Sequence, residues 1–337
     1  MGSPRETWRD ERRVHVLTRG NVDGITSAAL ALARYPDARV SFVTNAGLAS
    51  QAMRRDLSSR TFLLIDLGLT PPLAKTLGRK AAAGAQVVLL DHHDQTLRNE
   101  ALLDPAVARL IVPGISAAAV TRRWLGLERL THLSAIADVV EYCASDDLER
   151  VRVEVGDRRL HREAEMLDFA WRFDVPDDRF RTQVARRLAD GAWPSEIPEV
   201  RRRYFAILNE RRWERALERV RARIQVTGNV ALLSFPRRKP SLFGFGSRAV
   251  AAVARERGCR VALLVHRRAD IVSVSARLLA PCPEVPERIR PELDLGRFLH
   301  EFTAYHGGSG GGHPESAGGK IPHRALGTFL KEIEVFA

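Results

Sequence analysis

Six acidic and imidazole side chains in the first half of the chain have the types and spacing to hold a divalent cation. They are Asp23, Asp66, Asp91, His92, His93 and Asp138. A mixture of oxygen and imidazole ligands without thiolate suits manganese, with magnesium or zinc fitting less well. Such an ion would polarise a phosphoryl oxygen, lower the pKa of a bound water and neutralise developing charge. These residues therefore indicate metal-assisted hydrolysis of phosphate esters.

Short apolar runs alternate with helical stretches around these residues. Strands are predicted at 14–18, 40–44, 61–65 and 86–90, and helices at 25–34, 49–57, 71–83, 116–124 and 133–143. Such alternation is typical of a parallel sheet covered by helices. Because ligands gather beyond the carboxyl ends of parallel strands, Asp23, Asp66 and Asp91 are expected at one edge of the sheet.

A second, smaller α/β unit is predicted near the C-terminus. Its elements are strands at 230–234, 260–266 and 271–277, a helix at 246–257, a Gly-rich segment at 306–319 and a last helix from about His323. The Arg-rich stretch 197–225 is predicted as one long connecting helix. The fold class is thus α/β with two domains, 1–195 and 227–337, joined by a basic helical linker, 196–226.

The composition favours a cytoplasmic protein with a polyanionic partner. Of the 337 residues, 45% are hydrophobic and 28% charged, and no apolar run approaches the roughly 18 residues of a membrane span. The N-terminus has no apolar signal core. The net charge of +12 comes mainly from arginine, which suits phosphate, although a GC-rich genome would also favour arginine. Cys143, Cys259 and Cys282 are odd in number and far apart, so we interpret them as ordinary thiols.

Several of these features also have a purely structural explanation. Asp at a helix start, as for Asp23, is commonly an N-cap. Asp138 lies in an apolar helical stretch, where a carboxylate is either a ligand or a hydrogen-bonded core acid. The arginines of 197–225 either contact nucleic acid, together with the aromatic residues among them, or form a solvated face with intrahelical ion pairs.

Short motifs along the chain resemble those of the DHH/DHHA1 phosphoesterases, the family of RecJ-like and nanoRNase-like enzymes. In chain order they are Val22-Asp23-Gly24, Ile65-Asp66, Leu90-Asp91-His92-His93, Ile136-Ala137-Asp138-Val139-Val140, Ser273-Val274-Ser275-Ala276-Arg277 and Gly311-Gly312-His313-Pro314. The resemblance implies a DHH catalytic domain followed by a DHHA1 substrate-binding domain.

The same resemblance assigns roles to single residues. Asp66 would bridge metal positions, and the other ligands of one metal site would be Asp23, His92 and Asp138. Asp91 would orient its neighbours, and His93 would face the scissile phosphate or orient the metal ligands. In the second domain, a substrate phosphate would be held by Arg277, His313 and the backbone amides of Gly311 and Gly312.

The first motif departs from the family pattern His-x-Asp-x-Asp-Gly. Here it reads Arg19-Gly20-Asn21-Val22-Asp23-Gly24. Arginine cannot coordinate a metal, and Asn21 offers only a neutral carbonyl, a weak ligand. We therefore expect one tightly bound ion, Mn²⁺ before Mg²⁺, with Arg19 taking a catalytic role by stabilising negative charge. Alternatively, Arg19 forms an ion pair with Asp66 or Asp91 in an inactive site.

The expected function is a metal-dependent phosphodiesterase, a nuclease of the exonuclease or oligoribonuclease type. Its partners would be single-stranded DNA or RNA, or short oligonucleotides, without a membrane, and a homodimer is compatible with the sequence. A first alternative is a catalytically impaired nucleic-acid-binding or replication-associated homologue, favoured by the altered first motif. A second is an enzyme for small nucleotides such as cyclic dinucleotides or adenosine bisphosphate.

Overall fold

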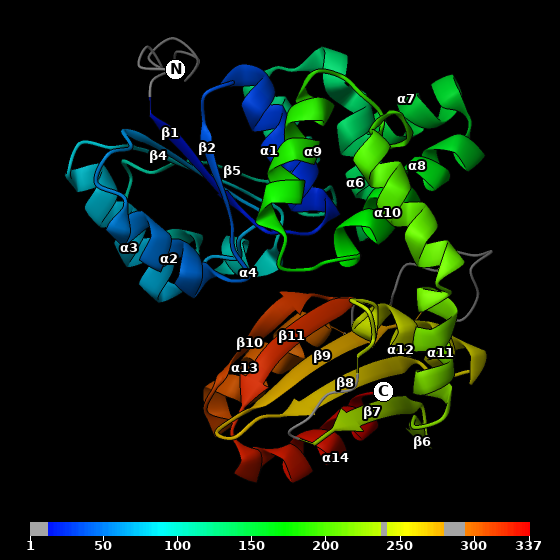
Figure 1. The fold of residues 1–337 in the computed structure, drawn as a ribbon. Helices are drawn as coiled ribbons and strands as arrows, with labels where there is room; N and C mark the ends of the chain where they lie inside the picture. Colours follow the sequence, from blue (N-terminus) through cyan, green and yellow to red (C-terminus); the bar gives the residue numbers. More distant parts are fainter. Residues whose placement is uncertain (1–12, 237–240, 280–293) are drawn as a thin grey trace. The chain divides into compact units, whose positions relative to one another are not determined.

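The computed structural model describes residues 13–236, 241–279 and 294–337 (Figure 1). Residues 1–12, on which the prediction about a signal segment rests, and Cys282 lie outside the described residues. The chain divides into two compact units, Met1–Phe205 and Ala206–Ala337. The division falls inside helix α10 (Pro198–Asn209), within the stretch 196–226.

The first unit is built on a parallel sheet of five strands. In sheet order these are β2 (Arg39–Phe42), β1 (Val14–Thr18), β3 (Thr61–Ile65), β4 (Gln86–Asp91) and β5 (Ala108–Ile111). Every residue of β1 and β3 is buried, as expected for continuous apolar runs covered on both faces. The α/β class predicted from the sequence is confirmed.

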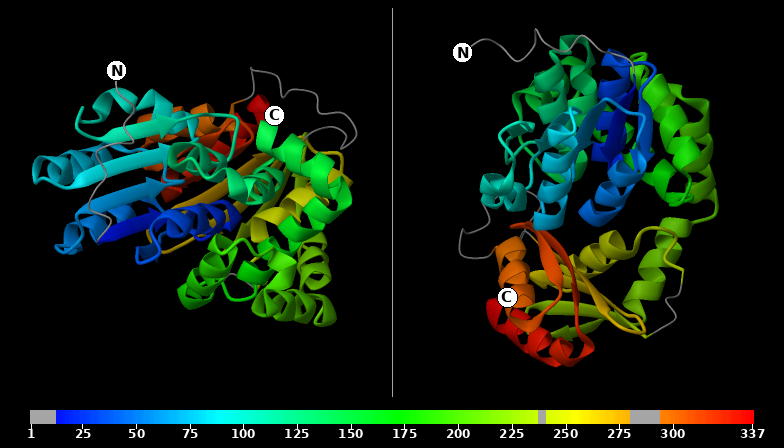
Figure 2. Two further views of the ribbon diagram at one scale, coloured as in Figure 1. Left: turned by 90° about the horizontal axis from the view of Figure 1, so that it is seen from above. Right: turned by 90° about the vertical axis from the view of Figure 1, so that its left-hand side faces the viewer.

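Helices lie on both sides of this sheet (Figure 2). They are α1 (Val22–Arg34), α2 (Ala46–Arg55), α3 (Pro71–Ala82), α4 (Asp94–Arg98), α5 (Ala117–Leu125), α6 (Thr131–Glu141), α7 (Asp146–Val155), α8 (Asp157–Arg172) and α9 (Asp178–Ala189). Helices α2 and α3 share one core with the sheet, to which Leu17, Leu64 and Leu73 belong. Helix α1 packs against α5, α6 and α9 on the other side.

The helices that carry or hold site residues begin at identifiable caps. The Asn21 side chain accepts from the Gly24 N–H at the start of α1, and Ser116 accepts from the Ala119 N–H at the start of α5. Short 3₁₀ turns complete the described helical elements, at Glu100–Leu102, Glu128–Leu130, Pro194–Glu196 (η4) and His323–Ala325.

The second unit holds a mixed sheet of six strands. In sheet order they are β10 (Ser309–His313), β11 (Ser316–Ile321), β9 (Val272–Leu278), β8 (Val261–Arg267), β7 (Val230–Phe235) and β6 (Gln225–Thr227). Only β7 and β8 run parallel among these described pairs. Besides the end of α10, its described helices are α11 (Arg212–Arg221), α12 (Gly246–Glu256), α13 (Leu295–His306) and α14 (Leu326–Phe336). Phe302 and Phe329 are buried in its core.

The structure corrects one predicted element and gives the conformation of another segment. The stretch 197–225 is not one helix, because Arg211 adopts a left-handed conformation with φ of 49° between α10 and α11. The Gly-rich segment forms the antiparallel hairpin β10–β11, in which Gly311 pairs with Gly318. Within the described residues, no helix combines the length and apolar character needed to cross a membrane.

Candidate metal centre

Four of the predicted site residues meet where β3 and β4 end. Asp66 follows β3, Asp91 closes β4, and His92 and His93 come next. One ligand atom from each of the four lies within 4.8 Å of all the others, and all four residues are buried. The crossover connections of a parallel sheet therefore deliver two strand ends, and with them both acids and both imidazoles, to one place.

Asp66 has two features that set it apart from an ordinary core acid. Its φ is +57°, a left-handed conformation that a non-glycine residue rarely adopts. Its Oδ2 atom is buried and accepts no hydrogen bond from any residue that the structure describes. Since buried carboxylate oxygens are ordinarily satisfied, this oxygen fits a cation that completes its environment.

The His92 ring presents a nitrogen to two acids. Its Nδ1 lies 2.8 Å from the carbonyl oxygen of Ile115, which only accepts, so Nδ1 carries a proton. Its Nε2 lies 3.4 Å from Asp66 Oδ1 and 3.6 Å from Asp23 Oδ2. Burial lowers the pKa of His92, but the two carboxylates outweigh it and the pKa ends well above its usual range. A nitrogen in this position demands a positive charge, supplied by a proton or by a metal ion.

Asp23 does not cap its own helix. The cap is Asn21, so the N-cap explanation of Asp23 is wrong. Instead its carboxylate accepts hydrogen bonds from the backbone N–H groups of Ala117, at 2.9 Å, and Ala118, at 2.8 Å, at the start of α5. Burial, followed by the charge of Asp66, raises the pKa of Asp23 well above its usual range.

Asp138 is held at the same helix start. Its Oδ1 accepts from the Ser116 N–H at 2.8 Å, and its Oδ2 accepts from the Ser145 hydroxyl. Burial raises its pKa. Among the described residues, Asp138 is not one of those whose ligand atoms cluster within 4.8 Å. The contacts are those of a hydrogen-bonded core acid, and its role as a metal ligand stays a prediction.

Asp91 anchors His93. Its Oδ1 lies 2.7 Å from His93 Nδ1, and its Oδ2 accepts from the Thr96 hydroxyl. Burial acts to raise the pKa of Asp91, but its interactions with His93, with His92 and with Thr96 bring it to about 2. The carboxylate is therefore ionised and fixes the His93 ring with the Nδ1 proton toward it.

Arg19 and Asn21 occupy the altered first motif beside these acids. The charge of Asp66 raises the pKa of the Arg19 guanidinium further above its ordinary value, and Glu141 adds to the effect. Asn21 Oδ1 accepts a hydrogen bond from the Gly24 N–H at 3.0 Å, and Asn21 Nδ2 donates one to Glu141 Oε1 at 3.3 Å. The Asn21 oxygen thus already serves as the cap of α1, and its use as a weak metal ligand stays a prediction.

Two residues near this cluster were missed from the sequence. Glu141 lies three residues after Asp138 on α6, a spacing that puts both on one side of a helix and could have indicated it. Cys143 interacts with the His92 ring, and burial raises its pKa to about 11. The thiol therefore stays protonated, as in an ordinary cysteine. The sequence spacing does not indicate that Cys143 lies beside His92.

In the second unit, strand register brings two predicted phosphate ligands into one row. Ser316 of β11 pairs with His313 on one side and with Arg277 on the other. Arg277 Nε is buried without a hydrogen-bond partner in the described chain, as expected of an anion ligand. A Cβ on Gly312, whose φ is +146°, would meet the Ser316 carbonyl oxygen at 2.3 Å. This glycine is thus required by strand packing, and phosphate binding by its amide stays a prediction.

Known proteins are similar to this chain in two ways, by a family model in the second unit and by the fold over both units. Residues 247–337 match the model of the DHHA1 domain. The DHH domain of a member of the s1p family of ribosomal proteins shares the fold over 96% of this chain and 87% of that chain, with a TM-score of 0.62 and 17% identity. Residues 247–337 thus resemble a DHHA1 domain, and the chain as a whole shares its fold with a DHH protein.

Two further solved structures share the fold of this chain. One is a pGpG-specific phosphodiesterase from Vibrio cholerae, with a TM-score of 0.52, 14% identity and coverage of 96% of this chain and 98% of that chain. The other is RecJ in complex with Mn²⁺ from Thermus thermophilus, with a TM-score of 0.56, 18% identity and coverage of 97% and 52%. No curated protein sequence matches the chain.

The residues of this site fit one divalent ion. The orphaned Asp66 oxygen and the His92 nitrogen supply a carboxylate and an imidazole at one place, a donor set that manganese accepts. In the first motif, Arg19 and Asn21 stand where the pattern His-x-Asp-x-Asp-Gly has a histidine and an aspartate, and the Asn21 oxygen is used as a helix cap. These two residues offer a cation and a neutral amide, which do not fit a second ion.

Proposed function

We propose that this protein is a metal-dependent phosphodiesterase that hydrolyses short or single-stranded oligonucleotides. The observation that carries the proposal is Asp66, a buried acid in a left-handed conformation. Its Oδ2 has no partner among the described residues, and its Oδ1 lies 3.4 Å from His92 Nε2. Strain and an unsatisfied buried group at one residue are typical of functional sites.

The chain supplies the ligands, an oriented imidazole and a permanent cation. Asp66 and His92 would hold the ion, with Asp23 next to them. A divalent ion there supplies Lewis-acid chemistry, because it withdraws charge from a phosphate ester and favours ionisation of water. Asp91 keeps the Nδ1 proton of His93 toward itself, so the Nε2 lone pair of His93 is suited to accept a hydrogen bond from a protonated phosphate or from water.

Arg19 would take over the electrostatic task of a second ion. Its guanidinium interacts with Asp66, Glu141 and Asp23, and it remains charged at every physiological pH. A guanidinium binds phosphate oxygens through two parallel hydrogen bonds, so it would stabilise charge that develops during hydrolysis.

The proteins of similar fold and the charge of the chain support a nucleotide substrate. RecJ is named as an exonuclease that binds manganese, and the Vibrio protein as a phosphodiesterase specific for pGpG. The net charge of +12 favours a polyanion over a small neutral ester. Short oligonucleotides satisfy both observations.

Cleavage of labelled oligonucleotides tests the proposal. Single-stranded DNA and RNA of two to twenty nucleotides are incubated with the protein in manganese and in chelator. Manganese-dependent cleavage is expected, with loss of about 100-fold or more in Asp66→Asn, because that variant loses a charged ligand. The exposed Asp37 gives the matched control, Asp37→Asn, which should cleave normally. Folded protein that cleaves none of these substrates in manganese would refute the proposal.

The altered first motif favours one second candidate, a nucleic-acid-binding homologue with impaired catalysis. Arg19 and Asn21 stand where the family has two ligands, and the described contacts of Asn21 commit its oxygen to the helix cap. The same assay separates the two, because this candidate binds the oligonucleotides in chelator and leaves them uncut in manganese.

A further inference from the structure

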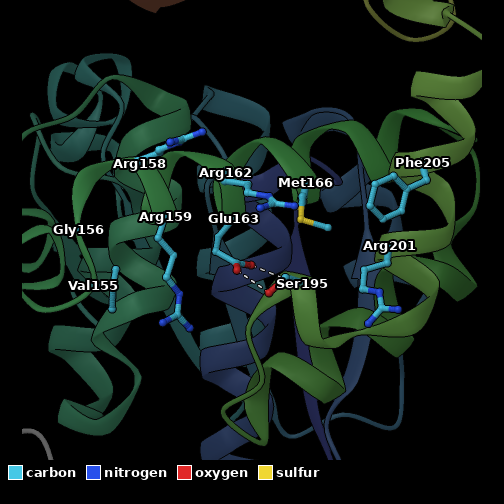
Figure 3. Close-up of a pocket in the computed structure, with 10 residues that line it drawn as sticks. All are labelled: Val155, Gly156, Arg158, Arg159, Arg162, Glu163, Met166, Ser195, Arg201 and Phe205. Carbon is cyan, nitrogen blue, oxygen red and sulfur yellow. Dashed lines mark hydrogen bonds between the residues drawn. The ribbon is translucent and has the colours of Figure 1, made fainter.

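A second concentration of positive charge lies on the first unit, away from the strand ends that carry the acids. It surrounds a hollow of about 780 Å³ between the start of α8, η4 and α10. Arginines make up four of the residues around it, namely Arg158, Arg159, Arg162 and Arg201 (Figure 3). Its volume is in the range of small-molecule binding pockets.

These four arginines differ from their neighbours in having no acid partner. Nearby, Arg152 pairs with Glu149 and Arg202 with Glu199, as on an ordinary charged helix surface. In the described part of the chain, no carboxylate lies within ion-pair distance of any of the four lining arginines. Their charge is therefore available to an anion from solution.

The acid inside the hollow is already occupied. Glu163 is buried, and its carboxylate accepts from the Ser195 N–H at 2.8 Å and from the Ser195 hydroxyl at 2.5 Å. These bonds fix η4 against α8 and leave the carboxylate engaged with neutral donors. One arginine is partly held as well, because the Arg159 guanidinium lies 5.0 Å from the centre of the Trp193 ring.

Helical spacing aligns the lining groups in two rows. On α8, Arg158 and Arg162 are four residues apart, and the buried Met166 follows after four more. On α10, Arg201 and Phe205 are also four apart, and 45% of Phe205 is exposed. Each row places guanidinium groups next to an apolar side chain. Phosphate on arginine and a base against an aromatic ring is the usual combination in proteins that bind single strands.

We propose that this hollow is a nucleotide-binding site distinct from the metal centre. The arginines of α8 and Arg201 would bind phosphates, and Phe205 with Met166 would contact the base. The nucleotide belongs either to a single strand or to a free nucleoside triphosphate, since both present the same groups. The site does not depend on hydrolysis at the metal centre, so failure of the proposed activity would leave it standing.

Binding in chelator tests the site without cleavage. The probes are a fluorescein-labelled ten-nucleotide dT strand, ATP and pyrophosphate, with the full-length protein and Arg158→Gln/Arg162→Gln. The exposed pair Arg179 and Arg187 on α9 gives the matched control, Arg179→Gln/Arg187→Gln, with the same change in charge. Melting curves verify that all variants are folded.

The α8 variant should bind nucleotides about tenfold or more weakly than the control variant. If the strand is bound here, the slope of log affinity against log salt should fall by about 1.4, because two phosphate contacts at about 0.7 each are lost. If the hollow binds ATP instead, Arg158→Gln/Arg162→Gln should bind ATP more weakly, and its slope of log affinity against log salt for the strand should stay unchanged. Equal affinity of both variants for strand and ATP overturns the proposal.

Phe205→Ala separates a nucleotide from a bare anion. It should weaken binding of the strand or of ATP several-fold and leave pyrophosphate binding unchanged, because pyrophosphate has no base. If Phe205→Ala binds all three probes as the wild type does, the hollow takes phosphate only and the nucleotide assignment is wrong.

Discussion

Asp66 joins three properties in one residue, namely burial, a left-handed backbone and an oxygen without a described partner. Each would be unfavourable alone, and together they fit a site completed by a cation. The neighbouring first motif explains why one ion is proposed where the family pattern would hold two. Arg19 brings a permanent charge, and Asn21 is committed to the cap of α1.

Restoring the family residues should restore a second metal position. We expect the wild-type protein to bind one Mn²⁺ ion and Arg19→His/Asn21→Asp to bind two, because the variant regains an imidazole and a carboxylate. Aspartate is as good an N-cap as asparagine, so α1 should keep its start. Calorimetric titration with Mn²⁺ measures the stoichiometry. A stoichiometry of one in the folded double variant would contradict this explanation.

The buried pair His15 and Asp56 makes the stability of the first unit depend on pH. His15 Nδ1 lies 2.6 Å from Asp56 Oδ2, and His15 Nε2 lies 2.8 Å from Ser41 Oγ. Burial lowers the pKa of His15 below its ordinary value of 6.5, with Asp56 opposing that effect. Burial acts to raise the pKa of Asp56, but hydrogen bonds from Ser59 and Ser58 outweigh it and hold the pKa below 3.8.

Both shifts predict a loss of stability in acid. Because both folded pKa values are lowered, both groups contribute stability at neutral pH. Their contribution to the free energy of unfolding should fall as the pH drops from 6.5 through the lowered pKa of His15, and fall again below 3.8 as Asp56 binds a proton. Because the raised pKa values of Asp23 and Asp138 act in the opposite direction, denaturant titrations between pH 3 and 8 compare the wild type with Asp56→Asn. The difference in stability between the two should shrink below pH 3.8, and a difference that stays constant with pH would disprove the assignment.

At the scale of elements, the hairpin β10–β11 depends on single glycines. A Cβ on Gly312 would meet backbone at 2.3 Å, whereas a Cβ on Gly327 in α14 would meet nothing within 4 Å. Gly312→Ala should therefore destabilise the protein by about 1–3 kcal/mol. Gly327→Ala should stabilise it by about 0.5–1 kcal/mol, since alanine is the better helix former. Denaturant unfolding of both variants tests this pair, and equal stability of the two would contradict the packing described.

Elements with strong local patterns were predictable from sequence. β3 has its predicted bounds, and β4 begins at its predicted residue and ends one residue later, because uninterrupted apolar runs end at polar residues. Their parallel order predicts that Asp23, Asp66 and Asp91 lie at one edge of the sheet. Asp66 and Asp91 belong to the observed cluster, and Asp23 lies beside it, with its Oδ2 3.6 Å from His92 Nε2.

Other elements follow from contacts that the local sequence does not show. No helix was predicted over 146–189, where charged residues dilute the apolar stripe of α7, α8 and α9. The bonds that take Asp23 and Asp138 to the start of α5 span 94 and 22 residues, so no spacing rule reveals them. The Gly-rich hairpin lacks the branched and aromatic residues typical of strands, and only its pairing with β9 makes it one.

For the whole molecule, the excess of arginine should govern association with nucleic acid. Affinity for a single-stranded dT strand is expected to fall steeply, by about 10-fold or more, between 50 and 200 mM salt, because bound strands release counterions. Fluorescence anisotropy in chelator measures this. Affinity that does not change over this salt range would show that the net charge of +12 does not act on a polyanion.

The left-handed conformation at Asp66 has a consequence for directed evolution. Glycine adopts φ of +57° without a steric penalty, and asparagine tolerates it better than most residues while removing a buried charge. In a library screened for heat resistance alone, replacements at position 66 should be enriched, and the fittest thermostable clones should be the ones that no longer take up manganese. A screen that also demands metal uptake would have to seek its stabilising changes elsewhere in the sheet.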